Sequence, residues 1–301
     1  MSIWRFDYAP HAAFVAPAIP KGQLWRLLIG IVLIAAFFLA LSQMLVNTVM
    51  SLAGGNGPSF ADPEAPVGQS PGEVLLLLAQ LGLLGVSAGL VCIVAHNRAP
   101  TTLVGPRTKA IGQFTAVLFV LVLIVLALLL LPPYGFDEPM QRNMGLATWL
   151  LLLPVGLIAV LIQVSAEELL FRGYLQQQLA ALSTSPFVWM ILPSAIFGAL
   201  HYTPSSAGSN AMTIAVLAGV FGLITADLTG RSGTLGPAIA LHFINNVQAI
   251  LITSPPDEMS GLALYVLPFG LGDEAKMAQW LPVDLGWMLV AWLGARLAIR
   301  A

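Results

Sequence analysis

Charged residues and cysteine are both scarce in this chain of 301 residues. Only 9% of the residues are charged, whereas a soluble globular domain carries roughly a quarter. The single cysteine, Cys92, excludes an intrachain disulfide and a cluster of thiolate metal ligands. Basic tracts are absent and the formal net charge is -2, so nothing in the composition indicates a nucleic-acid partner. These shortages favour a membrane protein.

Apolar residues are abundant, at 58% of the chain with a mean hydropathy of +0.88. A membrane-spanning helix needs about 20 predominantly apolar residues. The sequence predicts an all-α fold, a polytopic membrane helix bundle of about eight transmembrane helices with a site in its core. The expected spans are 24–50, 73–95, 112–132, 146–182, 187–202, 211–228, 235–253 and 281–299. The shorter apolar piece within 262–280 is expected to be interfacial or re-entrant.

The chain divides into a short N-terminal tail, residues 1–22, and a single membrane domain, residues 23–301, whose catalytic core is expected at about 146–253. The apolar run that follows Trp25 and Arg26 is much longer than the ~7–15 residues of a signal-peptide core. We therefore expect a first membrane helix here and no cleaved signal.

Lys and Arg are distributed unevenly between alternate loops, and such a bias sets membrane orientation. Eight crossings with both termini in the cytoplasm satisfy the bias, which predicts a multi-pass integral membrane protein of the plasma or inner membrane if the source is prokaryotic. The segment 146–182 is too long for one straight crossing at ~1.5 Å per residue. A kink at Pro154, or a part lying along the interface, is expected there.

Ionisable side chains lie inside the expected spans. Glu167 and Glu168 are adjacent, and His201 and His242 lie in later apolar segments. Placing such a group in hydrocarbon is costly, so these residues are expected to face a protein or water cavity and to be functional.

Helical geometry predicts how these groups are arranged. Glu168 and Arg172 are four residues apart, so Arg172 can neutralise Glu168 and leave Glu167 free to act as a general base. His242 and Asn246 share one helix face and could donate hydrogen bonds to an oxyanion. The glutamates and His201 lie at similar distances from the turn 183–186, so two antiparallel helices would bring them to the same depth, about 25 Å from it.

Three motifs occur in order: EExxxR, FxxxH and HxxxN. In this sequence they comprise Glu167, Glu168, Arg172, Phe197, His201, His242 and Asn246. At these residues the chain resembles the CAAX protease and bacteriocin-processing family, also called the ABI family, which includes the type II CAAX prenyl endopeptidases. The resemblance covers about 150–250.

The resemblance implies an intramembrane endopeptidase that acts on a peptide or membrane-anchored protein in the lipid bilayer. It implies that Glu167 activates a water, that His201 positions this water, and that His242 and Asn246 stabilise the oxyanion. Glu168 and Arg172 would hold Glu167, with Phe197 as a further supporting residue.

Family members have been described both as metal-free and as metal-dependent enzymes. We expect no cofactor, because HExxH is absent and Asn246 beside His242 suits an oxyanion site better than a metal shell. Zinc or another divalent metal remains the alternative, with Glu167, His201 and His242 as its protein ligands. No serine pairs plausibly with His201 or His242, and the GxGD at 270–273 is interpreted as a loop.

Two other functions stay open. A proton-coupled transporter could relay protons through the same glutamates and histidines, although such proteins usually contain repeats that are not evident in this sequence. A non-catalytic immunity or scaffold membrane protein could retain the fold without the reaction.

Overall fold

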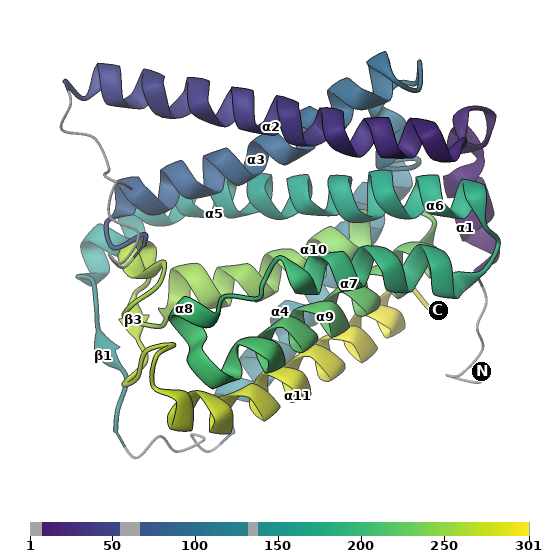
Figure 1. The fold of residues 1–301 in the computed structure, drawn as a ribbon. Coiled ribbons are helices and arrows are strands. Elements are labelled where there is room, and N and C mark those ends of the chain that lie inside the picture. Colours follow the sequence, from purple (N-terminus) through teal and green to yellow (C-terminus); the bar gives the residue numbers. More distant parts are fainter. Residues whose placement is uncertain (1–7, 55–66, 132–137, 301) are drawn as a thin grey trace.

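The computed structural model describes residues 8–54, 67–131 and 138–300, and helices dominate it (Figure 1). Three long helices occupy the first part of the chain. In order, the elements up to residue 129 are α1 (Ala9–Val15), η1 (Ala16–Lys21), α2 (Leu24–Leu52), α3 (Pro71–Val94), η2 (Pro100–Leu103) and α4 (Arg107–Leu129).

The second part of the chain contains more irregular helices and three very short strands. Its elements are β1 (Gln141–Arg142), α5 (Leu146–Glu168), η3 (Leu169–Gln176), α6 (Gln177–Leu182), η4 (Phe187–Ile191), α7 (Leu192–Ala199), α8 (Pro204–Ala207), η5 (Gly208–Asn210), α9 (Ala211–Ser232), α10 (Gly236–Asn246), η6 (Val247–Ile252), β2 (Thr253–Ser254), η7 (Ser260–Leu262), β3 (Tyr265–Val266) and α11 (Glu274–Ala298). Of the η segments, η3, η4 and η6 are π-helical.

Within the described residues, six helical runs are long and apolar enough to cross a membrane, and two shorter apolar runs accompany them. The long runs are Leu24–Leu52, Pro71–Val94, Arg107–Leu129, Leu146–Leu182, Pro204–Ser232 and Glu274–Ala298, and the short ones are Phe187–Ala199 and Gly236–Ile252. Each of the eight apolar stretches expected from the sequence overlaps one of these runs. The predicted all-α, polytopic membrane bundle is confirmed.

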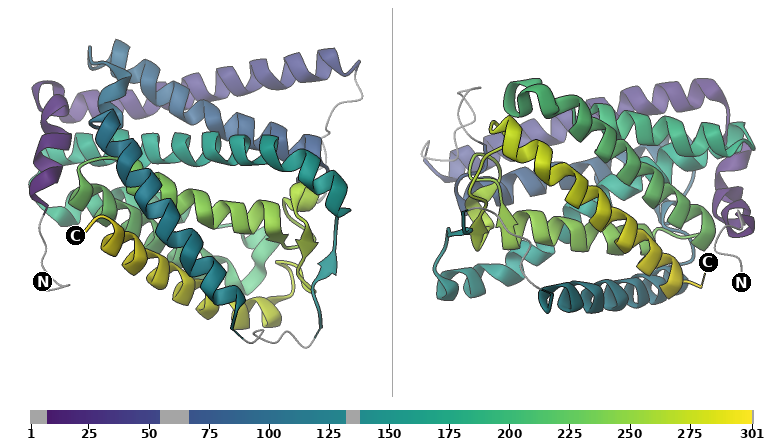
Figure 2. Two further views of the ribbon diagram at one scale, coloured as in Figure 1. Left: turned by 180° about the vertical axis from the view of Figure 1, so that it is seen from behind. Right: turned by 90° about the horizontal axis from the view of Figure 1, so that it is seen from below.

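The helix α5 lies at the centre of the bundle (Figure 1). It packs against α3 on one side and α10 on another, while α10 also packs against α4 and α9. The helices α7 and α9 form a second close pair, and α2 lies over α3 at the edge (Figure 2). The segment η3, which continues α5, packs against α3, α7 and α9, while α10 packs against α5 itself.

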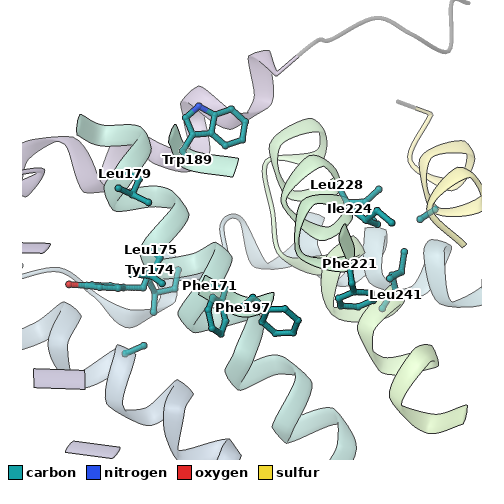
Figure 3. Close-up of a cluster of buried hydrophobic side chains, with 14 of the residues drawn as sticks. Phe171, Tyr174, Leu175, Leu179, Trp189, Phe197, Phe221, Ile224, Leu228 and Leu241 are labelled. Carbon is teal, nitrogen blue, oxygen red and sulfur yellow. The ribbon is translucent and has the colours of Figure 1, made fainter. Parts of the chain in front are cut away.

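Aromatic side chains fill the space where these helices meet (Figure 3). The rings of Phe171 and Phe197 pack edge to face with centroids 5.0 Å apart. Both are buried, as are Phe221 and Leu241 beside them. Phe171 and Phe197 are nearly equidistant from the turn at 183–186, so this contact confirms the predicted antiparallel register of the two helical segments.

The described part of the N-terminal segment is helical and packs on the bundle. His11 and Phe14 of α1 are buried, and α1 contacts α9. Asp227 of α9 accepts hydrogen bonds from the Tyr8 hydroxyl at 2.8 Å and from the Trp292 indole of α11 at 2.9 Å. The helix α1 and the end of α11 therefore lie at one end of the bundle (Figure 1), as an even number of crossings requires.

The stretch 262–280 differs in part from its expected form. Its first half contains β3, the central strand of a small sheet in the order β1-β3-β2. Its second half already belongs to α11, which begins at Glu274 and not at 281. The helix begins early because the Asp273 carboxylate accepts a hydrogen bond from the backbone N–H of Lys276. The aspartate of the GxGD sequence is thus a helix cap.

Candidate active site

A buried ion pair lies where α5 continues into η3. Arg172 Nη1 is 2.9 Å from Glu168 Oε1, and both side chains are almost completely buried. Arg172 Nη2 also donates to the backbone carbonyl of Gly222 in α9 at 3.1 Å. The pairing predicted from the four-residue spacing is confirmed. Through Arg172, Glu168 is held against α9 as well as within its own helix.

His242 of α10 lies between the two adjacent glutamates. Its Nδ1 is 2.8 Å from Glu168 Oε1, and its Nε2 is 3.6 Å from Glu167 Oε2. Since a carboxylate can only accept and Glu168 already accepts from Arg172, Nδ1 is the donor in the shorter contact. The opposite nitrogen of the ring then faces Glu167 at a separation longer than a direct hydrogen bond, so both groups can contact a water placed beside them.

Glu167 is held from its own helix. Gln163 Nε2 donates to Glu167 Oε1 at 2.5 Å, and Gln163 Oε1 accepts from Asn246 Nδ2 at 3.0 Å. The Glu167 side chain is 12% exposed, whereas that of Glu168 is fully buried. Glu167 is therefore the carboxylate of this pair that another molecule can reach.

His201 follows the end of α7 and is exposed. Its Nδ1 is 2.8 Å from the backbone carbonyl of Phe197, so this nitrogen donates within the same turn and Nε2 is left for other contacts. The Phe197 ring lies 4.6 Å from the His201 ring and 6.2 Å from the His242 ring, measured between centroids. Phe197 thus separates the two imidazoles and packs against both.

A π-helical stretch follows the glutamates and orients the polar residues behind them. Within and after η3, Gln176, Gln177 and Gln178 are all buried. Gln177 accepts from Arg98 Nη1 at 2.7 Å, and Gln178 Nε2 lies 3.3 Å from His96 Nδ1. Wide turns of this kind are frequent at functional sites. Here they allow three successive glutamine side chains to form contacts with surrounding elements.

Of the seven motif residues, Glu167, Glu168, Arg172, His242 and Asn246 belong to one connected polar network. Phe197 packs against that network, since the Arg172 guanidinium lies 5.1 Å from its ring centroid. His201 is linked to the network by its contacts with Phe197. Gln163 is the member that the motifs do not include, although its position four residues before Glu167 places it on the same helix face.

The same geometry bears on the alternative of a metal site. Among the residues that the structure describes, no group of three or more His, Cys, Asp or Glu side chains is arranged so that it could hold a metal ion. Both nitrogens of His242 are directed at carboxylates, and Nδ1 of His201 is engaged by its own helix. In this arrangement Glu167, His201 and His242 do not fit a metal as a ready ligand set.

The fold and these contacts define a multi-pass helical membrane protein with a polar network enclosed among its helices. Residues 148–248, which contain all seven motif residues, match the family model described as Type II CAAX prenyl endopeptidase Rce1-like. The resemblance inferred from the motifs is confirmed over this segment.

A similar protein is found in Bacillus subtilis (strain 168). Over 125 residues the chain is 26% identical to the uncharacterized protein YyaK, and the aligned region covers 42% of each protein. The chain thus spans less than half the length of that relative. No solved structure matches the chain.

Proposed function

We propose that the chain is an intramembrane endopeptidase in which Glu167 activates the attacking water. The observation that carries this proposal is the pair of unequal glutamates. Glu168 is neutralised by Arg172, while Glu167 is partly exposed and faces the Nε2 of His242 across 3.6 Å. A carboxylate and an imidazole directed at one space can both contact a water placed beside them.

In the proposed reaction, Glu167 accepts a proton as the water oxygen bonds to the carbonyl carbon of the substrate. The carbonyl oxygen becomes an oxyanion, which the remaining amide N–H of Asn246 stabilises, together with His242 when the ring carries a proton on Nε2 as well as on Nδ1. Glu167 then returns the proton to the departing nitrogen, and the peptide bond breaks into an acid and an amine. His201, through its free Nε2, helps to position the water.

The proposed substrate is a peptide or a membrane-anchored protein, because the match to a protease family implies a peptide bond as the reacting group. The partial exposure of Glu167 supports access from outside the bundle.

We also propose that the reaction needs no metal, because both nitrogens of His242 are engaged by carboxylates and the described residues form no group that could hold a metal ion. Metal analysis of the purified protein, together with activity before and after treatment with a chelator, tests this. Activity that is lost on chelation and restored by zinc would contradict it.

The proposed function is tested by comparing protein termini in cells that contain wild type or Glu167→Gln. The amide cannot accept the proton of the water, so cleaved termini should appear only with wild type. A quenched fluorescent peptide copied from the cleavage site then gives kcat and KM for the purified proteins. Cleavage by Glu167→Gln at the wild-type rate would rule out the proposed base.

The same variants separate a protease from a proton-coupled transporter. A transporter with these residues would lose transport in Glu167→Gln without any difference in cleaved termini. A scaffold would retain its cellular phenotype in the same variant.

A further inference from the structure

Gln163 connects two groups that the proposed reaction uses. Its side chain is buried, with a relative exposure of 4%. The amide N–H donates to Glu167 Oε1 at 2.5 Å, and the amide oxygen accepts from Asn246 Nδ2 at 3.0 Å. One side chain therefore joins the base on α5 to the amide on α10.

The two contacts require one orientation of the Gln163 amide. If the amide were rotated by half a turn, its oxygen would face the Glu167 carboxylate and its nitrogen would face the Asn246 nitrogen. Both attractive contacts would become repulsive, since a carboxylate has no donor and an amide nitrogen has no free lone pair. The chemistry of Glu167 and Asn246 thus locks Gln163, and Gln163 in turn fixes the distance between them.

This orientation also decides which atoms remain available. Oε1 of Glu167 is occupied by Gln163, so Oε2 is the oxygen that faces His242 and the space beside it. For Asn246, the oxygen accepts from Asn245 Nδ2 at 3.3 Å and one N–H is donated to Gln163. The second N–H of Asn246 is the donor that these two contacts leave for an oxyanion.

We propose that Gln163 is a positioning residue of the active site, which selects Oε2 of Glu167 as the basic atom and orients Asn246 toward the oxyanion. This inference rests on the proposed function and adds to it a residue outside the three motifs. A glutamine that only satisfied buried neighbours would affect stability, whereas a positioning residue affects the chemical step.

The test compares purified Gln163→Leu with Gln176→Leu as a matched control. Gln176 is also a buried glutamine of the same helical run, and it contacts His11 and the carbonyl of Ala226 outside the network. Thermal unfolding in detergent measures the loss of stability in each variant. The quenched peptide from the cleavage-site comparison measures kcat and KM.

Gln163→Leu is expected to lower kcat about tenfold to a hundredfold with an unchanged KM, because two partly buried polar groups lose their partner in the reacting geometry. Gln176→Leu is expected to lower the unfolding temperature and leave kcat unchanged. Gln163→Glu keeps the shape and can still accept from Asn246, but the new carboxylate cannot donate to Glu167. We expect its kcat to be low at neutral pH and to recover partly in mild acid, where the new carboxyl group regains a proton.

Infrared spectroscopy detects the contact between Gln163 and the Glu167 carboxylate in the absence of substrate. The carboxylate band that disappears in Glu167→Gln identifies Glu167, and this band should shift in Gln163→Leu and stay in place in Gln176→Leu. A folded Gln163→Leu with wild-type kcat, or with an unshifted band, would overturn the positioning role while leaving the proposed base intact. Full cleavage by Glu167→Gln would instead remove the proposed function, and the role of Gln163 with it.

Discussion

A proton on both ring nitrogens of His242 would balance the charges of the site. Arg172 carries one positive charge, the two glutamates can carry two negative charges, and His242 contacts both carboxylates. A proton gained by His242 would therefore neutralise the network. The energy of a buried charge depends strongly on such pairing, because water is too distant to solvate it. The network can thus accept a proton during a reaction without leaving an isolated buried charge.

Among single substitutions, Arg172→Met should be strongly destabilising. It removes the cation from a fully buried carboxylate, and breaking such a pair typically costs about 3–5 kcal/mol. The midpoint of thermal unfolding in detergent measures the effect. The matched control is Lys276→Met, because Lys276 pairs with Glu138 at the surface, where the two side chains are 42% and 62% exposed.

The control should change stability by about 1 kcal/mol or less, as is usual for an exposed pair. Equal unfolding midpoints for Arg172→Met and Lys276→Met would contradict the structural importance of the buried pair.

Single residues also show how far the sequence alone can predict this site. The Glu168–Arg172 pair follows from helix periodicity, and their burial follows from the apolar segment around them. The contact of His242 with both glutamates does not follow, because it depends on how α10 packs beside α5. Gln163 could have been found from its spacing to Glu167, yet its bond to Asn246 joins two helices that are far apart in the sequence.

Among the elements, the crossing of α3 and α5 determines where Glu167 lies. Gly85 of α3 meets Ala166 so closely that an added Cβ would lie 3.0 Å from the Ala166 Cα. Ala166 directly precedes Glu167, so any side chain at position 85 would displace the base. The sequence indicates close packing at Gly85 and Gly89, because small residues allow membrane helices to approach. It does not indicate that the neighbouring helix is the one carrying the glutamates.

Gly85→Val should therefore lower both stability and activity. Forcing a larger side chain into a packed contact typically costs about 1–3 kcal/mol, and the shift of α5 should lower kcat as well. Gly112→Val in α4 is the control, since an added Cβ there meets nothing within 4 Å. Unfolding midpoints and peptide cleavage measure both effects, and normal kcat in a folded Gly85→Val would show that the crossing does not set the position of Glu167.

For the whole molecule, α1 links the N-terminal segment to the bundle through a buried histidine. His11 stacks on Trp189 with ring centroids 4.1 Å apart, and its Nε2 lies 3.1 Å from Gln176 Nε2. Burial lowers the pKa of His11 from its ordinary value of 6.5 to about 4. Burial also lowers the pKa of His96, which lies beyond the end of α3. Both histidines therefore favour the neutral form in the folded protein.

Acidification should consequently destabilise the fold. Above pH 6.5 His11 is neutral in both states and contributes no pH dependence. As the pH falls from 6.5 toward 4, the unfolded chain gains a proton that folded His11 resists, so stability declines by up to about 3 kcal/mol and then levels off. Unfolding midpoints between pH 8 and pH 4 measure this slope. His11→Phe should reduce the slope and leave the part due to His96, whereas an unchanged slope would contradict the assignment to His11.

The whole-molecule arrangement is predicted well in outline, since hydropathy alone locates the eight apolar segments. The packing of the segment before residue 22 is less accessible. Tyr8 and Trp292 meet at Asp227, and no local pattern in the sequence connects residues so distant from one another.

The wide turns of η3 have a consequence for how this segment can change in length. Deleting one residue from Leu169–Gln176 would tighten the winding into an ordinary α-helix, a locally more regular form. Because the shortened segment is wound more tightly, Gln177 and Gln178 would stay close to the directions in which they meet Arg98 and His96. We therefore expect η3 to tolerate the loss of one residue better than α5, where the same loss would turn the later side chains by about 100°.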